Sequence, residues 1–196
     1  MIGIVNYGAG NIFSLTAALV RCNLSYGMIN EPSDFEKYDR IIIPGVGHAG
    51  AAMQKLQDSG LASAILEQTK PVLGICVGMQ LMTSFSEEGS ADLLNVFPMK
   101  TLHFQHHIEE KVPHMGWNSI RRIGECPLFD GIADGSYFYF VHSFFIEYNE
   151  QFTAAATLYG IDYSAGIHRD NFYGVQFHPE KSGTVGEQLL TNFAKL

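Results

Sequence analysis

The stretch VLGICVGMQ, residues 72–80, joins an apolar run, a single cysteine and a short amphipathic run. A continuous apolar strand, predicted here over residues 71–75, is typical of a parallel sheet that is covered on both faces. Gly74 and Gly78 stand two residues before and two after Cys76, which is the glycine spacing of a sharp turn from a strand into a helix. The stretch therefore predicts a strand, a tight turn that carries Cys76, and a helix.

The rest of the chain extends this pattern. Hydrophobic spacing predicts further strands and helices in the first half, which alternate along the chain. The strands are expected at 2–6, 25–30, 40–44 and 71–75, and the helices at 11–22, 48–60 and 77–85. The second half is β-rich, and a last helix is expected at 186–196. We therefore predict one α/β domain over residues 1–196, with a largely parallel central sheet flanked by helices and a β-rich C-terminal half.

Composition limits the function. The 196 residues include 46% hydrophobic residues, enough for a core without disulfides. The net charge is −8 and the 12 Lys and Arg residues are scattered, so we expect no nucleic-acid partner. No apolar run approaches the roughly 18 residues that cross a bilayer, so we expect no membrane partner either. The three cysteines have no paired spacing, which indicates a reducing compartment, and we expect a cytoplasmic protein without a signal peptide.

Cys76 has two possible roles. The predicted turn places it at the start of a helix, where unpaired N–H groups and the helix dipole favour a thiolate nucleophile. The alternative is a small buried thiol with a purely structural role, which is common in protein cores. This stretch by itself leaves both open.

A base for such a nucleophile is available near the C-terminus, in the segment VQFHPE that ends at residue 180. Residues two apart on a strand point to the same face, with Cα atoms roughly 6.6 Å apart. Glu180 is therefore expected to reach His178 and to orient its imidazole, as the third member of a catalytic triad does. A surface histidine beside a solvated glutamate is the alternative.

The third element is the segment IIIPGVGH, residues 41–48, where an apolar strand runs into a glycine-rich loop. Glycines let backbone N–H groups approach a ligand closely. The N–H groups of Val46 or Gly47, together with that of Val77, are expected to form an oxyanion hole. An ordinary strand-to-helix turn is the alternative.

Taken together, the motifs PGVG, GICVGMQ and FHPE resemble those of the class I, or triad, glutamine amidotransferases, over essentially the whole chain. The resemblance implies a flavodoxin-like core and a Cys76–His178–Glu180 triad that hydrolyses glutamine to glutamate and ammonia, with no cofactor. It also implies the groups that hold the substrate, which are Gly47, Gln80, Glu88 and the backbone of His142, Ser143 and Phe144.

Five motifs in order resemble a narrower group, the glutaminase subunits of imidazole glycerol phosphate synthases. They are YGAGNxxS, PGVG, SEEG, VPHMGWN and YFYFVHSF, whereas Asn6 stands where that group more often has aspartate. The resemblance implies a role in histidine biosynthesis and a heterodimer with a (β/α)₈ cyclase subunit that receives the ammonia. It places Gly8, Asn11, Tyr139 and Lys181 at the interface.

Other interpretations stay open. A sister subunit that supplies ammonia for sugar amidation in surface polysaccharide synthesis would look almost identical, because the partner chooses the acceptor. A stand-alone cysteine amidohydrolase would share the triad but need no partner, and a non-catalytic binding module would lack a complete triad. His103, His106, His107 and His114 lack a convincing set of co-ligands, so we predict no metal site.

Overall fold

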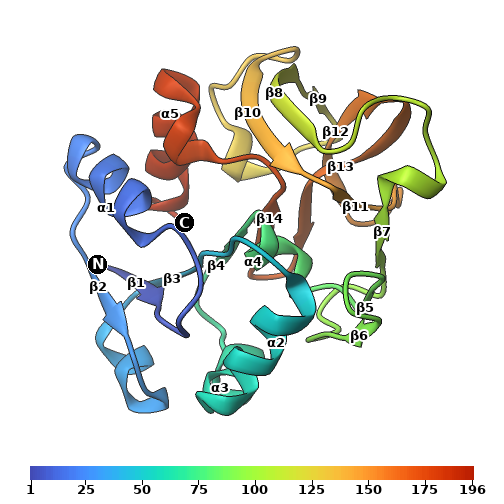
Figure 1. The fold of residues 1–196 in the computed structure, drawn as a ribbon. Coiled ribbons are helices and arrows are strands. Elements are labelled where there is room, and N and C mark those ends of the chain that lie inside the picture. Colours follow the sequence, from blue (N-terminus) through green and yellow to red (C-terminus); the bar gives the residue numbers. More distant parts are fainter.

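Five parallel strands form the centre of the fold in a computed structural model that describes all residues, 1–196 (Figure 1). Their order is β2-β1-β3-β4-β14, the flavodoxin-like order with the last strand supplied by the C-terminal half of the chain. The strands are β1 (Ile2–Val5), β2 (Tyr26–Ile29), β3 (Arg40–Ile43), β4 (Val72–Ile75) and β14 (Phe172–Val175). The predicted parallel sheet is confirmed.

The β-rich second half extends this sheet and adds a separate ribbon. Beyond β14 the order continues β13-β11-β7-β5-β6, and β12 branches from β13 and pairs in turn with β9. These strands are β5 (Phe85–Ser86), β6 (Ala91–Asp92), β7 (Lys100–His103), β9 (Arg121–Arg122), β11 (Phe144–Ile146), β12 (Thr153–Tyr159) and β13 (Ile161–Arg169). The antiparallel ribbon pairs β8 (His114–Ser119) with β10 (Tyr137–His142).

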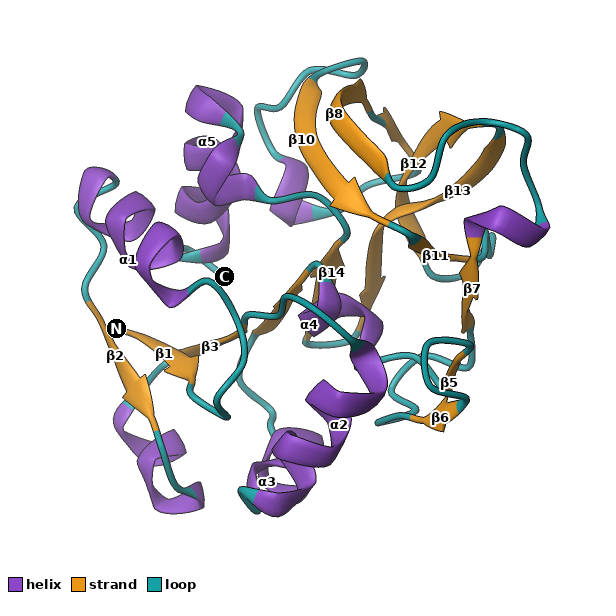
Figure 2. Ribbon diagram, viewed as in Figure 1, coloured by secondary structure: helices purple, strands orange, loops and turns teal.

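Helices cover both faces of the parallel strands. Figure 2 shows α1 and α5 on one side of the sheet, and α2 and α3 on the other. Their bounds are α1 (Ile12–Arg21), α2 (Ala49–Asp58), α3 (Leu61–Leu66), α4 (Val77–Gln80) and α5 (Gly183–Phe193). Four 3-10 helices complete the fold, η1 (Pro32–Lys37), η2 (Phe104–His106), η3 (Pro127–Phe129) and η4 (Pro179–Lys181). None of the helices has the length and apolar character to span a bilayer.

Local chemistry explains where α1 starts and where α2 ends. The Asn11 side chain accepts the Ser14 N–H at 3.2 Å and so caps α1. Helix α2 ends just before Gly60, whose φ of +72° is a conformation that glycine adopts without strain.

Two helical predictions need correction, and one helix was missed. The predicted helix at 77–85 is only the single turn α4, because the chain turns at Thr83, whose hydroxyl donates to the Gln80 carbonyl at 2.8 Å. The chain then continues into β5, which pairs with β7. The last helix starts at Gly183 rather than at 186, and α3 was not predicted.

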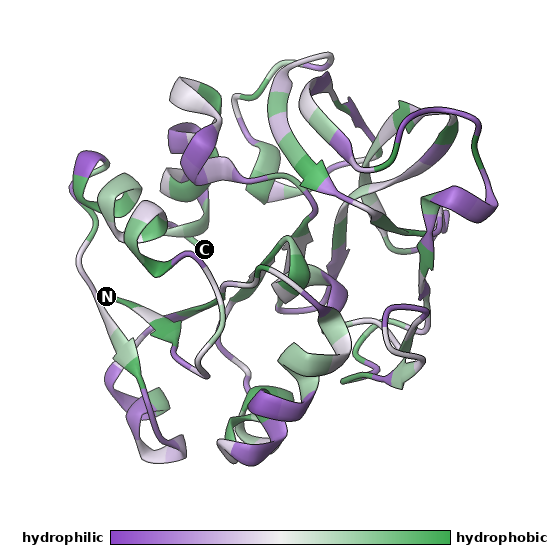
Figure 3. Cartoon of the chain, viewed as in Figure 1, coloured by the Kyte–Doolittle hydropathy of each residue, from purple (hydrophilic) through white to green (hydrophobic).

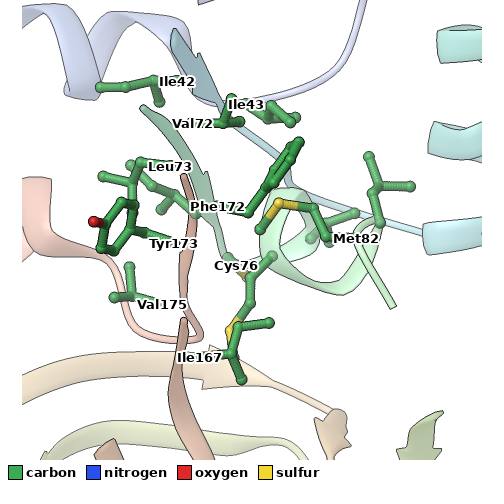
Figure 4. Close-up of a cluster of buried hydrophobic side chains, with 14 of the residues drawn as sticks. Ile42, Ile43, Val72, Leu73, Cys76, Met82, Ile167, Phe172, Tyr173 and Val175 are labelled. Carbon is green, nitrogen blue, oxygen red and sulfur yellow. The ribbon is translucent and has the colours of Figure 1, made fainter. Parts of the chain in front are cut away.

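A single hydrophobic cluster of 54 buried residues joins the sheet to its helices. Figure 3 shows the hydrophilic colouring on outer segments such as the one that carries η2. Figure 4 shows side chains of β3, β4 and β14 packed together, with Cys76 at the end of β4 among them. The central strands are buried along almost their whole length, as the apolar runs predicted.

The burial of β4 predicts a large difference between two leucine truncations. Leu73 is fully buried, whereas Leu158 on β12 is 64% exposed. We expect Leu73→Ala to lower the free energy of unfolding by about 2–5 kcal/mol, because it removes buried methyl groups and leaves a cavity. Leu158→Ala is the control and should change it by less than about 0.5 kcal/mol. Urea denaturation followed by circular dichroism measures both, and equal losses would contradict the role of β4 in the core.

Candidate active site

Cys76 occupies a strained turn between β4 and α4. Its φ of 54° and ψ of −112° are rare for a residue with a side chain, and such a conformation costs of the order of 1–3 kcal/mol. The glycines on either side make the turn possible. A Cβ added at Gly74 would lie 2.5 Å from the Gly78 carbonyl oxygen, and one at Gly78 would lie 1.9 Å from the Ile43 carbonyl oxygen. The turn therefore excludes any larger side chain at both positions, as the sequence predicted.

The glycine-rich loop after β3 packs directly against this turn. A Cβ at Gly45 would lie 2.4 Å from the Gly78 backbone nitrogen. The Tyr7 hydroxyl donates to the Pro44 carbonyl at 2.7 Å and holds the start of the loop. Gly47 has a φ of +87°, and Val46 is 41% exposed. The backbone of residues 46–47 is thus next to Cys76 at the mouth of the site.

His178 and Glu180 form a buried pair. The His178 Nδ1 and Glu180 Oε1 atoms are 2.7 Å apart, and the two side chains are 3% and 4% exposed. The prediction of a contact is right, but the predicted strand geometry is wrong. Strand β14 ends at Val175, and Glu180 lies in the 3-10 helix η4, which begins after His178. A tight helical turn, rather than the alternation of a strand, brings the carboxylate back to the imidazole.

The neighbours of His178 keep its imidazole protonated. Burial by itself would lower the pKa of this imidazole, but hydrogen bonds to Cys76 and Glu180 outweigh burial and raise the pKa to about 10. An imidazolium between a thiol and a carboxylate stabilises a thiolate beside it. The arrangement is that of a nucleophile, a base and a group that orients the base.

One cavity of about 320 Å³ gathers the residues that the sequence predicted for catalysis and substrate binding, a volume within the range of small-ligand sites. Those that line it are Val46, Gly47, Cys76, Val77, Gln80, Glu88, His142, Ser143, Phe144 and His178. Glu180 lies behind His178 and borders a second, much smaller cavity.

The predicted interface residues divide into two groups. Lys181 lines the large cavity, and its ammonium lies 5.7 Å from the centre of the Tyr139 ring. Gly8 and Asn11 lie in the segment between β1 and α1, outside the large cavity. Asn11 borders the smaller cavity with His178 and Glu180, and the Gly8 carbonyl accepts a hydrogen bond from the Lys55 ammonium at 2.9 Å. The structure also contains no cluster of three or more His, Cys, Asp or Glu side chains able to hold a metal ion.

Comparison with known proteins identifies the family. The family model for glutamine amidotransferase class-I matches residues 4–196. The chain belongs to this family. Solved structures with the same fold include PurLQS from Thermotoga maritima and the glutaminase domain of CTPS from Trypanosoma brucei. Their TM-scores are 0.74 and 0.70 at 15% and 14% identity, and they cover 99% of this chain and 97% and 93% of their own.

Curated relatives match over the full length of this amidotransferase. A Bacteroides fragilis protein described as imidazole glycerol phosphate synthase subunit HisH is 45% identical and covers 100% of this chain and 99% of its own. Haemophilus influenzae and Campylobacter jejuni have relatives described as HisH and HisH 1, which are 45% and 38% identical. They cover 99% and 100% of this chain and 96% and 100% of their own lengths.

Sequence reasoning missed Gln176 in this amidotransferase site. Its side chain is fully buried, and its Nε2 atom lies 3.7 Å from the Cys76 sulfur, where it donates a weak hydrogen bond. Its Oε1 atom accepts from Gln80 Nε2 at 3.0 Å. One signal could have found it, because a glutamine inside the apolar run FYGVQF has to be hydrogen-bonded if that run is buried.

Glu88 reaches the site from the loop before β6. Its Oε2 atom accepts the Ala49 N–H at 2.5 Å, at the first turn of α2. Helix α2 follows the glycine-rich loop directly, so this carboxylate also anchors the segment that carries Val46 and Gly47.

The triad geometry predicts how fast Cys76 reacts with a thiol reagent. Glu180→Gln removes the charge that stabilises the imidazolium, and so weakens the thiolate beside it. We expect the rate of Cys76 alkylation by iodoacetamide at pH 7 to fall about tenfold, because less of the thiol is ionised when the imidazolium beside it is lost. Mass spectrometry resolves Cys76 from Cys22 and Cys126. Glu187→Gln, which removes a partly exposed carboxylate that pairs with Arg21, is the control. An unchanged rate in Glu180→Gln would contradict the role of the pair.

Two other buried histidines predict the pH dependence of stability. Burial lowers the pKa of His142 to about 3 and that of His114 to about 4. Below pH 6.5 the unfolded chain therefore binds more protons than the folded chain, and stability falls as the pH falls. We expect a loss of about 1 kcal/mol per histidine between pH 6.5 and 5.5. His178 offsets only a small part of this loss, because its raised pKa stabilises the folded chain fully only below the unfolded value of 6.5, and that contribution declines as the pH rises from 6.5 to about 10.

Urea denaturation at several pH values from 5.5 to 6.5 measures this slope. His142→Gln should reduce it, whereas His106→Gln, at an exposed position, should leave it unchanged. A slope that is the same in both variants would contradict the assignment of neutral buried histidines.

Proposed function

We propose that this chain is the glutaminase subunit of an imidazole glycerol phosphate synthase, active in histidine biosynthesis. Residues 1–196 would act as one glutamine amidotransferase domain that hydrolyses L-glutamine and delivers ammonia to a cyclase subunit. The observation that carries the proposal is one cavity that brings Cys76, His178 and the 46–47 backbone together. Relatives described as a subunit of that synthase, which match over the full length, support the choice of reaction.

The geometry of the cavity supports the following first half of the reaction. The Cys76 thiolate attacks the carboxamide carbon of glutamine, and the oxyanion faces the N–H groups of Val77 and of Val46 or Gly47. His178, held as an imidazolium by Glu180, donates its proton to the departing ammonia. The product on the enzyme is a γ-glutamyl thioester.

The second half returns the enzyme to its starting state. Neutral His178 takes a proton from a water molecule, which attacks the thioester and releases glutamate. The amino-acid part of the substrate is held by Gly47, Gln80 and Glu88, and by the backbone of residues 142–144, all of which border the cavity. Glu88 supplies the negative charge that pairs with the substrate ammonium.

A partner is supported by the surface beside the cavity. The ribbon of β8 and β10 exposes Met115, Trp117 and Tyr137, whose exposed fractions are 63%, 56% and 59%. Large aromatic and methionine side chains of this kind are enriched at protein interfaces. Lys181 lies at the cavity and against the Tyr139 ring of the same ribbon. We propose that a (β/α)₈ barrel, the cyclase subunit, docks on this ribbon and on the segment of Gly8 and Asn11.

Reconstitution with a partner tests the proposal. We expect glutaminase activity of the chain to be weak by itself and to rise at least tenfold when the cyclase and its ribotide ligand are both present. Cys76→Ala should abolish the activity in both conditions, because no other group can form the thioester. Release of glutamate, measured enzymatically, follows both.

The controls separate the other interpretations. Stimulation by a sugar-amidating synthase, and not by the cyclase, would identify the sister subunit instead. Full activity without any partner would identify a stand-alone amidohydrolase. Activity that survives Cys76→Ala would contradict the mechanism itself.

A further inference from the structure

A chain of buried polar side chains runs from the β8–β10 ribbon to the active cavity, and the triad chemistry does not use its first part. His114 and His142 lie directly opposite each other in the ribbon. Both contact the hydroxyl of Tyr163 on β13, at 2.9 Å from His114 Nδ1 and at 3.0 Å from His142 Nε2. All three side chains are buried, Tyr163 completely.

One carbonyl determines the direction of every hydrogen bond in this chain. The Phe144 carbonyl lies 2.7 Å from His142 Nδ1 and can only accept, so Nδ1 carries the hydrogen. His142 is neutral, since burial lowers its pKa to about 3, and its Nε2 atom therefore accepts from the Tyr163 hydroxyl. The hydroxyl oxygen in turn accepts from His114 Nδ1.

The chain ends at Asn118 on the outer part of β8. Because His114 donates through Nδ1, its Nε2 atom accepts, and Asn118 Nδ2 supplies the hydrogen at 3.4 Å. The same Asn118 amide donates its second hydrogen to the Leu158 carbonyl at 2.9 Å. The hydrogen-bonding atoms of both imidazoles and of the Tyr163 hydroxyl are thereby satisfied in one arrangement.

The same carbonyl also orients two amides beside Cys76, that of Gln80, which lines the active cavity, and that of Gln176, which is buried behind it. Gln80 Nε2 donates to the Phe144 carbonyl at 3.3 Å and to Gln176 Oε1 at 3.0 Å, so both of its hydrogens are used. Gln176 must then turn its own Nε2 toward the Cys76 sulfur. Gln80 Oε1 has no hydrogen-bond partner within the chain and is not among the fully buried unpaired atoms. The cavity that Gln80 lines is therefore where this oxygen is exposed.

We propose that His114, Tyr163 and His142 form a positioning relay that fixes the Phe144 carbonyl and, through it, the amide orientations of Gln80 and Gln176. With the relay intact, Gln80 presents an acceptor to the cavity, which favours a ligand with a donor or a cation at that point. Gln176 presents a donor to the Cys76 thiolate. If the Phe144 carbonyl turns away, both amides are free to flip. Gln80 then presents its NH₂ group to the cavity, and Gln176 presents its oxygen to the Cys76 sulfur.

The tautomers of the two histidines test the relay without any substrate. Long-range ¹H–¹⁵N correlation spectra at pH 7 report which ring nitrogen carries the hydrogen. We expect His114 and His142 both to be neutral and protonated on Nδ1, with assignments taken from His114→Gln and His142→Gln. Nε2 protonation of either ring in the unsubstituted chain would overturn the proposal.

A single hydroxyl deletion tests the consequence in the cavity. Tyr163→Phe keeps the ring and removes the group that joins the two histidines. We expect the rate of Cys76 alkylation at pH 7 to fall several-fold, and the KM for glutamine to rise about tenfold, with a smaller change in kcat.

Ser164→Ala is the matched control. Ser164 is the next residue on β13, is equally buried, and bonds to Thr153 and to the Glu147 carbonyl rather than to the relay. Both variants lose a buried hydroxyl and some stability, but only Tyr163→Phe should change the alkylation rate and KM. Equal alkylation rates in the two variants would overturn the proposal.

The relay rests on the proposed glutaminase function only for its KM readout. If the chain failed to hydrolyse glutamine under every condition, the proposed function would fail, while the tautomers and the alkylation rates would still decide the relay.

Discussion

The close approach of Gly78 to the Ile43 carbonyl oxygen is the contact on which the site depends. It lets the turn after β4 lie against the loop after β3, so a nucleophile on one strand end meets backbone N–H groups on the next. A methyl group at Gly78 would separate them, because the only space for it is already filled by backbone that cannot yield. The parallel order of β3 and β4 brings their carboxyl ends to one edge, and the two glycine-rich turns then use that edge.

Around this contact, two buried histidines have opposite pKa shifts. His178 faces a carboxylate and a thiol, and its pKa is raised to about 10 although burial opposes the charge. His142 faces a carbonyl, a hydroxyl and another imidazole, and burial lowers its pKa to about 3. One imidazole is therefore held as a proton donor and the other as a neutral spacer, although both border the same cavity. The difference comes from the partners, since both side chains are almost completely buried.

Much of the fold could be predicted from local patterns. The apolar runs at 40–44 and 71–75 predicted buried parallel strands, and they are β3 and β4. Local patterns failed where a tertiary contact competes with them. The segment after Gln80 has helical spacing, yet it leaves the helix to pair with β7. Glu180 was placed on a strand, yet it lies in a 3-10 turn that still delivers its carboxylate to His178.

By itself, the sequence determined the kind of chemistry, because the glycine spacing around Cys76, the HPE segment and the PGVG loop each require particular residue types for steric or acid–base reasons. It also determined the parallel α/β core, since continuous apolar runs are stable only when both faces are covered. Only the tertiary structure decided which atoms meet across the cavity. Gln176, Tyr163 and His114 come from distant segments, and hydrogen-bond direction becomes defined only when a fixed acceptor such as the Phe144 carbonyl is placed among them.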